Sequence, residues 1–169
     1  MNGRVLAGGL SSRFGSDKAL YCLDGEPMAV RTARILTEAG LSSVALVVRA
    51  PRGLGLPEVI EPAWPSASPL ARHPLWGIAA ALDGDTFFAP CDLPELTVEQ
   101  VRRLLDANAV ATDQPLLGVW PGALKDELGS LATAGASVRS VAARLRQLDI
   151  GPVPNLNRPP PPPGAAGAR

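Results

Sequence analysis

Residues 5–20 read Val-Leu-Ala-Gly-Gly-Leu-Ser-Ser-Arg-Phe-Gly-Ser-Asp-Lys-Ala-Leu, and the rest of the chain is organised around this stretch. The short apolar run before the glycines, residues 4–7, predicts a buried strand. Gly8 and Gly9 let the backbone N–H groups of a turn approach an anion, because no Cβ stands in the way, and such a turn forms a positive concavity. Arg13 and Lys18 add positive charge at its rim. The loop therefore predicts an anionic ligand, most simply a polyphosphate.

Two named phosphate-binding signatures do not fit this loop. Lys18 is followed by Ala19, which excludes G-x-x-x-x-G-K-[ST], and G-x-G-x-x-G is absent as well. On physical grounds alone, an ordinary strand-to-helix turn with surface cations is an equal alternative, so the loop needs support from elsewhere in the chain.

Length, charge and cysteine content narrow the class of protein. A chain of 169 residues suits one compact α/β domain. Lys plus Arg and Asp plus Glu both number 16, which argues against an extended electrostatic footprint for nucleic acid. Cys22 and Cys91 lie far apart and are expected to be small buried thiols. The N-terminus enters a strand at once and no apolar run could cross a bilayer, so a cytoplasmic protein is expected.

Local signals predict alternating strands and helices. Pro27 suits the first turn of a helix that Gly40 ends. Thr97 and Gln100 predict a capping box, and Ser137 a further N-cap. The other predicted helices are 75–82, 98–107, 123–134 and 137–148, and the later predicted strands are 44–48, 58–61, 86–89, 114–120 and 150–153. This alternation predicts a parallel sheet with ligands at the carboxyl ends of its strands.

Two segments differ in composition from the rest. Residues 51–74 are rich in Pro, Gly and Ser and predict a long loop. Residues 158–169 hold five consecutive prolines followed by Gly-Ala-Ala-Gly-Ala-Arg, which cannot build a core, so we predict a disordered Pro-rich tail. A single domain over residues 1–157 is the remaining expectation.

Asp92 follows the predicted strand 86–89, and Pro94 fixes the turn after it. Since the carboxyl ends of parallel strands share one edge, we expect Asp92 beside the glycine loop. A carboxylate there suits Mg²⁺, which takes one or two protein carboxylates and leaves its other positions to water and phosphate oxygens. The alternative is an Asx-turn in which Asp92 only caps the following loop.

Several motifs together carry a resemblance to a known family. Residues 6–19, Leu-Ala-Gly-Gly-x-Ser-x-Arg-Phe-Gly-x-Asp-Lys-Ala, resemble the signature loop of the molybdenum cofactor guanylyltransferases, within the Rossmann-like nucleotidyltransferases. Four later segments follow in the family's order: 73–78 is similar to G-P-L-x-G-[IM], 90–94 to the metal-binding C-D-x-P, 114–116 to a Gln-Pro-Leu strand, and 155–159 to N-x-N-T-P. The resemblance implies a three-layer α/β/α Rossmann-like fold with a mostly parallel central sheet.

The same resemblance implies a reaction and roles for particular residues. The enzyme would transfer GMP from GTP to the terminal phosphate of molybdopterin (Mo-molybdopterin), giving molybdopterin guanine dinucleotide and pyrophosphate. Molybdoenzymes or their chaperones would be candidate partners, while no nucleic acid or membrane partner is expected. The implied site comprises the nucleotide-binding residues Leu6, Ala7, Gly8 and Gly9, the phosphate-neutralising residues Arg13 and Lys18, the Mg²⁺ and nucleotide ligand Asp92, and the pterin-substrate residues Asn155 and Asn157.

Three positions depart from the family pattern. Arg49 stands where a nucleotide-contacting Asn is usual, Pro62 where Asp is often found, and His73 where Gly precedes Pro-Leu. The final helix of the family is replaced by the proline run. Two alternatives stay open: a cytidylyltransferase acting on the same pterin, although Leu-Ala-Gly-Gly favours the guanylyl branch, and a non-catalytic nucleotide-binding adaptor.

Overall fold

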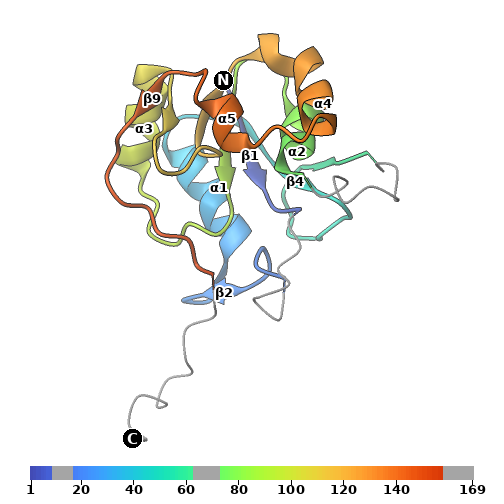
Figure 1. The fold of residues 1–169 in the computed structure, drawn as a ribbon. Helices are drawn as coiled ribbons and strands as arrows, with labels where there is room; N and C mark the ends of the chain where they lie inside the picture. Colours follow the sequence, from blue (N-terminus) through green and yellow to red (C-terminus); the bar gives the residue numbers. More distant parts are fainter. Residues whose placement is uncertain (9–16, 63–72, 158–169) are drawn as a thin grey trace, which may run out of the picture.

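A computed structural model describes residues 1–8, 17–62 and 73–157 (Figure 1). The predictions for Gly9, for Arg13 and for the tail 158–169 fall outside the described residues, as does part of the predicted long loop. The extent of the single domain, residues 1–157, stays a prediction.

One mixed sheet forms the centre of the described structure. Its seven strands are β1 (Asn2–Leu6), β4 (Ser42–Val48), β5 (Glu58–Ile60), β6 (Thr86–Pro90), β7 (Val110–Ala111), β8 (Gly118–Trp120) and β9 (Gln147–Leu148), in the order β5-β4-β1-β6-β8-β7-β9. Every neighbouring pair is parallel except the two that involve β8. Leu6 pairs with Val47 on one side and with Pro90 on the other, so β1 and β6 end at one edge.

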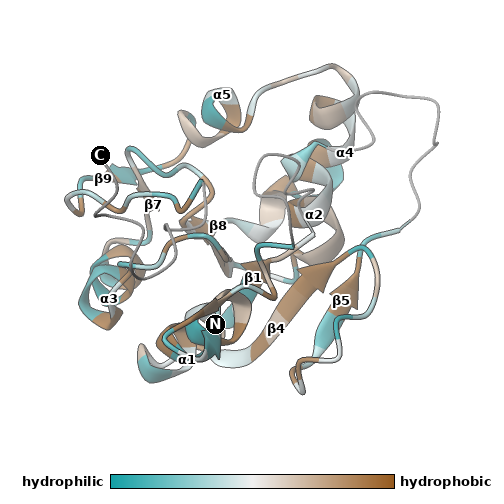
Figure 2. Ribbon diagram, turned by 90° about the horizontal axis from the view of Figure 1, so that it is seen from below, coloured by the Kyte–Doolittle hydropathy of each residue, from teal (hydrophilic) through white to brown (hydrophobic). Residues whose placement is uncertain are grey.

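Helices cover both faces of this sheet, as the α/β/α prediction requires. One face carries α1 (Met28–Glu38) and α3 (Val98–Ala107), and the other carries α2 (Pro74–Ala81), α4 (Lys125–Thr133) and α5 (Val138–Ala142). Strand β4 shows why: Leu46 and Val48 pack into the core under α1 and α3, while Val47 packs into the core under α2 and α4. A strand buried on both faces is apolar throughout, and Figure 2 shows that hydrophobic colour in β4 between α1 and α2.

The predicted turn and capping signals are confirmed. Gly40 follows α1 with a φ of +100°, a left-handed value that favours glycine. Thr97 and Gln100 form the expected capping box on α3, and Ser137 caps α5. A turn at residues 24–25 joins the strands of a small hairpin, β2 (Cys22–Leu23) and β3 (Glu26–Pro27), which leads into α1.

Four predicted elements need correction. The helix predicted over 137–148 ends at Ala142, because the backbone of residues 146–148 instead bonds to β7 and forms β9. The last strand is therefore 147–148 rather than 150–153. The segment 114–120 is extended only at β8, and the segment 123–134 begins with a 3₁₀ turn, Gly122–Leu124, before α4. Cys22, predicted to be buried, is exposed on the hairpin, whereas Cys91 is buried.

Among the residues that the structure describes, no helix is both long and apolar enough to span a membrane.

Candidate functional site

Lys18 and Asp92, 74 residues apart in the sequence, meet at the carboxyl edge of the sheet. The Lys18 Nζ lies 3.0 Å from the Asp92 Oδ2, and the two side chains are 18% and 20% exposed. Asp92 follows the end of β6, and Lys18 lies in a turn that Asp17 starts by accepting a bond from the Ala19 N–H. The predicted juxtaposition of the loop lysine and the carboxylate is therefore present.

The segment 155–157 lies against the same pair. Asn155 Nδ2 donates to Asp92 Oδ1 at 3.1 Å, and Lys18 Nζ donates to Asn157 Oδ1 at 3.4 Å. The backbone N–H of Leu156 also donates to the Asp92 carbonyl oxygen at 2.8 Å. Residues that the family resemblance assigns to the nucleotide and to the pterin substrate thus share one hydrogen-bonded cluster.

Leu6, Ala7 and Gly8 stand beside this cluster, at the end of β1. The Ala7 N–H donates to the Val47 carbonyl oxygen at 2.9 Å, and the Cys91 N–H donates to the Leu6 carbonyl oxygen at 3.3 Å. These bonds fix the start of the glycine loop between β4 and β6.

Residues of the β4–β5 connection join the site, and the sequence reasoning assigned them no role in it. Arg52 forms an ion pair with Asp17 and also donates from Nη2 to the Ala7 carbonyl oxygen at 3.4 Å. The Arg49 Nε lies 3.5 Å from the Glu61 Oε2. A basic residue shortly after an apolar strand was the only signal for Arg52, and Arg49 was noted only as a departure from the family.

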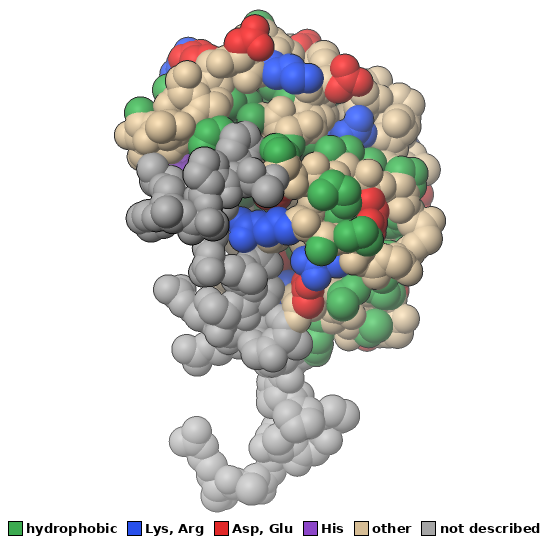
Figure 3. Space-filling model, turned by 90° about the vertical axis from the view of Figure 1, so that its right-hand side faces the viewer, with side chains coloured by type: hydrophobic (Ala, Val, Ile, Leu, Met, Phe, Trp, Pro, Cys, Tyr) green, Lys and Arg blue, Asp and Glu red, His purple; other side chains and the backbone are tan. Residues whose placement is uncertain are grey.

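Glu61 fills the space between two glycines. A Cβ on Gly8 would lie 2.6 Å from the Glu61 Oε1, and a Cβ on Gly77 would lie 3.0 Å from the same atom. Glycine at both positions therefore makes room for this carboxylate. Basic and acidic side chains also lie close together on the face shown in Figure 3.

Comparison with known proteins bears on this arrangement. Residues 3–150 match the family model of the MobA-like NTP transferase domain. The chain belongs to that family. The resemblance that the motifs carried is thereby confirmed, and with it membership of the nucleotidyltransferases.

Individual members of the MobA-like family are similar over much of the chain. A molybdenum cofactor guanylyltransferase from Rhizobium rhizogenes is 32% identical over an alignment 185 residues long, and the alignment covers 92% of this chain and 86% of that protein. One from Bordetella pertussis is 39% identical over 113 residues, covering 63% of this chain but only 56% of the relative. The solved molybdopterin-guanine dinucleotide biosynthesis protein A from Archaeoglobus fulgidus has a TM-score of 0.67 at 21% identity, over 88% of this chain and 82% of that one, which confirms the fold.

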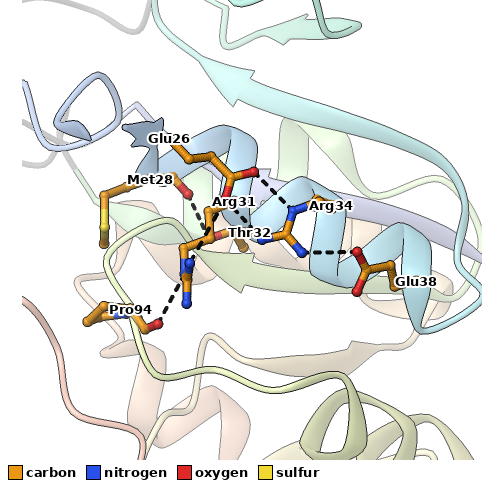
Figure 4. A network of polar contacts seen from close by, with 7 residues as sticks. All are labelled: Glu26, Met28, Arg31, Thr32, Arg34, Glu38 and Pro94. Atoms are coloured by element: carbon orange, nitrogen blue, oxygen red, sulfur yellow. Dashed lines mark hydrogen bonds and ion pairs between the residues drawn. The ribbon is translucent and has the colours of Figure 1, made fainter. Parts of the chain in front are cut away.

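In this member of the MobA-like family, α1 anchors the loop that carries Asp92. Arg31 Nε donates to the Pro94 carbonyl oxygen at 3.2 Å, as Figure 4 shows. Arg34 holds Glu26 through two bonds of 3.0 and 2.9 Å, which ties the small hairpin to the same helix. Helix α1 thus holds the turn after Asp92 through the side chain of Arg31.

Cys91 supplies no chemistry of its own. Burial raises the pKa of its thiol to about 12, and the nearby carboxylates Asp92 and Asp17 add to the effect. Because the thiolate is the reactive form of cysteine, this thiol is inert near neutral pH. His73 also has a structural contact: its ring accepts a bond from the Leu75 N–H and caps α2.

The Asp92 carboxylate is the group in this cluster that would hold a magnesium ion. Each carboxylate oxygen offers two lone pairs, and the contacts with Lys18 and Asn155 take one on each. Within the described part of the chain, no group of three or more His, Cys, Asp or Glu side chains could hold a metal ion. The second lone pair on each Asp92 oxygen would suit an ion that takes a single protein carboxylate and completes its shell with water and phosphate oxygens.

Proposed function

We propose that the chain transfers GMP from GTP to the terminal phosphate of molybdopterin, with release of pyrophosphate. Relatives that cover most of the chain carry the name molybdenum cofactor guanylyltransferase. The observation that carries the proposal is the 3.0 Å contact between Lys18 and Asp92, since it joins the glycine loop to the carboxylate.

The chemistry of the site suits this transfer. Nucleotidyl transfer depends on positioning and on neutralising charge, with little covalent work for the protein. Lys18 would neutralise the triphosphate, and Asp92 would hold Mg²⁺, which when bound offsets the charge that develops on the leaving pyrophosphate. The attacking phosphate is already anionic, so no general base is required.

Asn155 and Asn157 would receive the pterin substrate. Because both amides contact the Lys18–Asp92 pair, the acceptor phosphate would enter directly beside the nucleotide. Such an arrangement supplies the proximity that an in-line displacement needs.

A pyrophosphate-release assay with GTP, Mg²⁺ and molybdopterin tests the proposal. The wild-type chain and Asp106→Asn, a variant of an exposed residue on α3, are expected to turn over, whereas Asp92→Asn loses activity while remaining folded. Absence of turnover in the wild type, with GTP binding intact, would instead favour the nucleotide-binding adaptor.

Base preference is a separate question. Calorimetry in the presence of Mg²⁺ is expected to show GTP binding more tightly than CTP. Equal or reversed affinities would favour the cytidylyltransferase alternative, since base selection depends on a few hydrogen bonds within one pocket.

A further inference from the structure

Gln114 belongs to the Gln-Pro-Leu segment, which the proposed reaction leaves without a role. Its Nε2 lies 2.6 Å from the Asn155 Oδ1 and 2.9 Å from the Val153 carbonyl oxygen. Asn155 in turn contacts Asp92 through Nδ2. Three side chains from separate parts of the sequence therefore form one chain of hydrogen bonds that ends on the candidate metal ligand.

We propose that Gln114 is a positioning residue: it fixes the orientation of the Asn155 amide, so that this amide donates to Asp92. The proposal rests on the proposed function for its kinetic consequence, but the orientation itself is independent of any substrate.

The donor and acceptor roles along this series of hydrogen bonds are fixed by the acceptors at its two ends, the Val153 carbonyl oxygen and the Asp92 carboxylate. The Val153 carbonyl oxygen can only accept, so Gln114 must present its NH₂ group there. The same NH₂ group reaches Asn155, which must therefore place its carbonyl oxygen toward Gln114. The Asn155 NH₂ group is then directed at the carboxylate of Asp92, which also only accepts. Turning either amide over would place acceptor against acceptor at one end.

This orientation completes the restraint on the Asp92 carboxylate. Oδ2 accepts from Lys18 and Oδ1 accepts from Asn155, so both oxygens are held in defined directions. Without Gln114, the Asn155 amide could turn its oxygen toward Asp92 and repel it. Partners that orient a ligating group in this way commonly contribute 10–100-fold to activity or metal affinity.

The informative variant is Gln114→Glu, because its carboxylate has nearly the same shape but cannot donate. It would attract the Asn155 NH₂ group and turn the Asn155 oxygen toward Asp92. We expect kcat for pyrophosphate release to fall ~10–100-fold with a smaller change in KM for GTP. The matched control is Gln147→Glu, the same substitution on an exposed residue of β9, which is expected to retain wild-type kinetics.

A double-mutant cycle separates positioning from a simple structural tether to Val153. If Gln114 acts through Asn155, then Gln114→Glu has less than about a twofold effect on kcat in an Asn155→Ala background. A loss in that background as large as in the wild type would overturn the proposal, because the effect would then bypass Asn155.

A measurement without substrate tests the orientation directly. In ¹⁵N-correlated NMR spectra, the Asn155 side-chain NH₂ pair is identified by its absence from Asn155→Ala. It is expected to shift in Gln114→Glu and to stay in place in Gln147→Glu. If the Asn155 NH₂ signals do not shift in Gln114→Glu, the inference is refuted, even when the wild-type chain shows normal turnover. If the signals shift but the wild-type chain shows no turnover, only the proposed function is refuted.

Discussion

Replacing Lys18 by Met separates the electrostatic role of the site from its contribution to stability. Methionine keeps much of the apolar stem and removes the charge that lies 3.0 Å from Asp92. At that distance two unit charges attract by about 5–6 kcal/mol if the effective dielectric constant is about 20. Most of this attraction is offset by desolvation and side-chain ordering, so pairs with solvent access contribute only about 1 kcal/mol.

Asp92, which is already a fifth exposed, would also keep a donor in Asn155 after the substitution. We therefore expect Lys18→Met to lower the free energy of unfolding by ~1 kcal/mol, which corresponds to roughly 2–4 °C in Tm for a domain of this size. Differential scanning calorimetry measures this change. The expected loss of turnover is far larger, ~10²–10³-fold, because the cation that would neutralise the developing phosphate charge has no substitute in the variant.

Lys125→Met is the matched control, since Lys125 is the only other lysine of the chain and is exposed at the start of α4. It should retain wild-type pyrophosphate release and Tm. The reasoning would be refuted if Lys18→Met kept normal turnover. It would equally be refuted if Tm fell by more than about 10 °C, because the lost activity would then follow from unfolding.

Three further predictions concern neighbouring features. Gly8→Ala would push the end of the Glu61 side chain from its place, so calorimetry should show weaker GTP binding with little change in Tm, and unchanged affinity would contradict this. Thr97→Ala removes the cap of α3 and should lower the free energy of unfolding in urea by about 1 kcal/mol without affecting turnover. Because burial raises the pKa of the Cys91 thiol to about 12, the unfolded chain releases that proton first, and stability should fall as pH rises from about 9 toward 12. Cys91→Ala should flatten that fall.

The fold was predictable where short-range chemistry decides it. The capping box at Thr97, the left-handed Gly40 and the apolar run of β4 each depend on residues close in sequence, and all three were predicted correctly. The predicted helix 137–148 failed for the opposite reason. Its apolar spacing suits a helix, but backbone bonds from Val110 and Thr112 claim residues 146–148 for the sheet. No local pattern reveals a competing partner so far away.

The candidate site also has parts that the sequence predicts and parts that it does not. Lys18 and Asp92 could be predicted to meet, since strand ends of a parallel sheet share an edge and each motif is recognisable by itself. The resemblance assigned Asn155 to the pterin substrate but did not predict its contact with Asp92, because residues 155–157 lie in no helix or strand whose direction could be predicted. Gln114 was visible as part of a motif, but its role depends on the polarity of an amide, which the sequence does not record.

The ion pairs of the described site were not predicted from the sequence. The predicted positive rim of the glycine loop consisted of Lys18 and of Arg13, which lies outside the described residues. In the described part of the site each cation instead has a carboxylate partner: Lys18 with Asp92, Arg52 with Asp17 and Arg49 with Glu61. Each of these pairs is nearly neutral at a distance, so the described cations would act on an anionic ligand mainly at close range. Under the proposed function, a nucleotide bound together with Mg²⁺ would satisfy the Asp92 carboxylate through the ion, while Lys18 would turn to the phosphates.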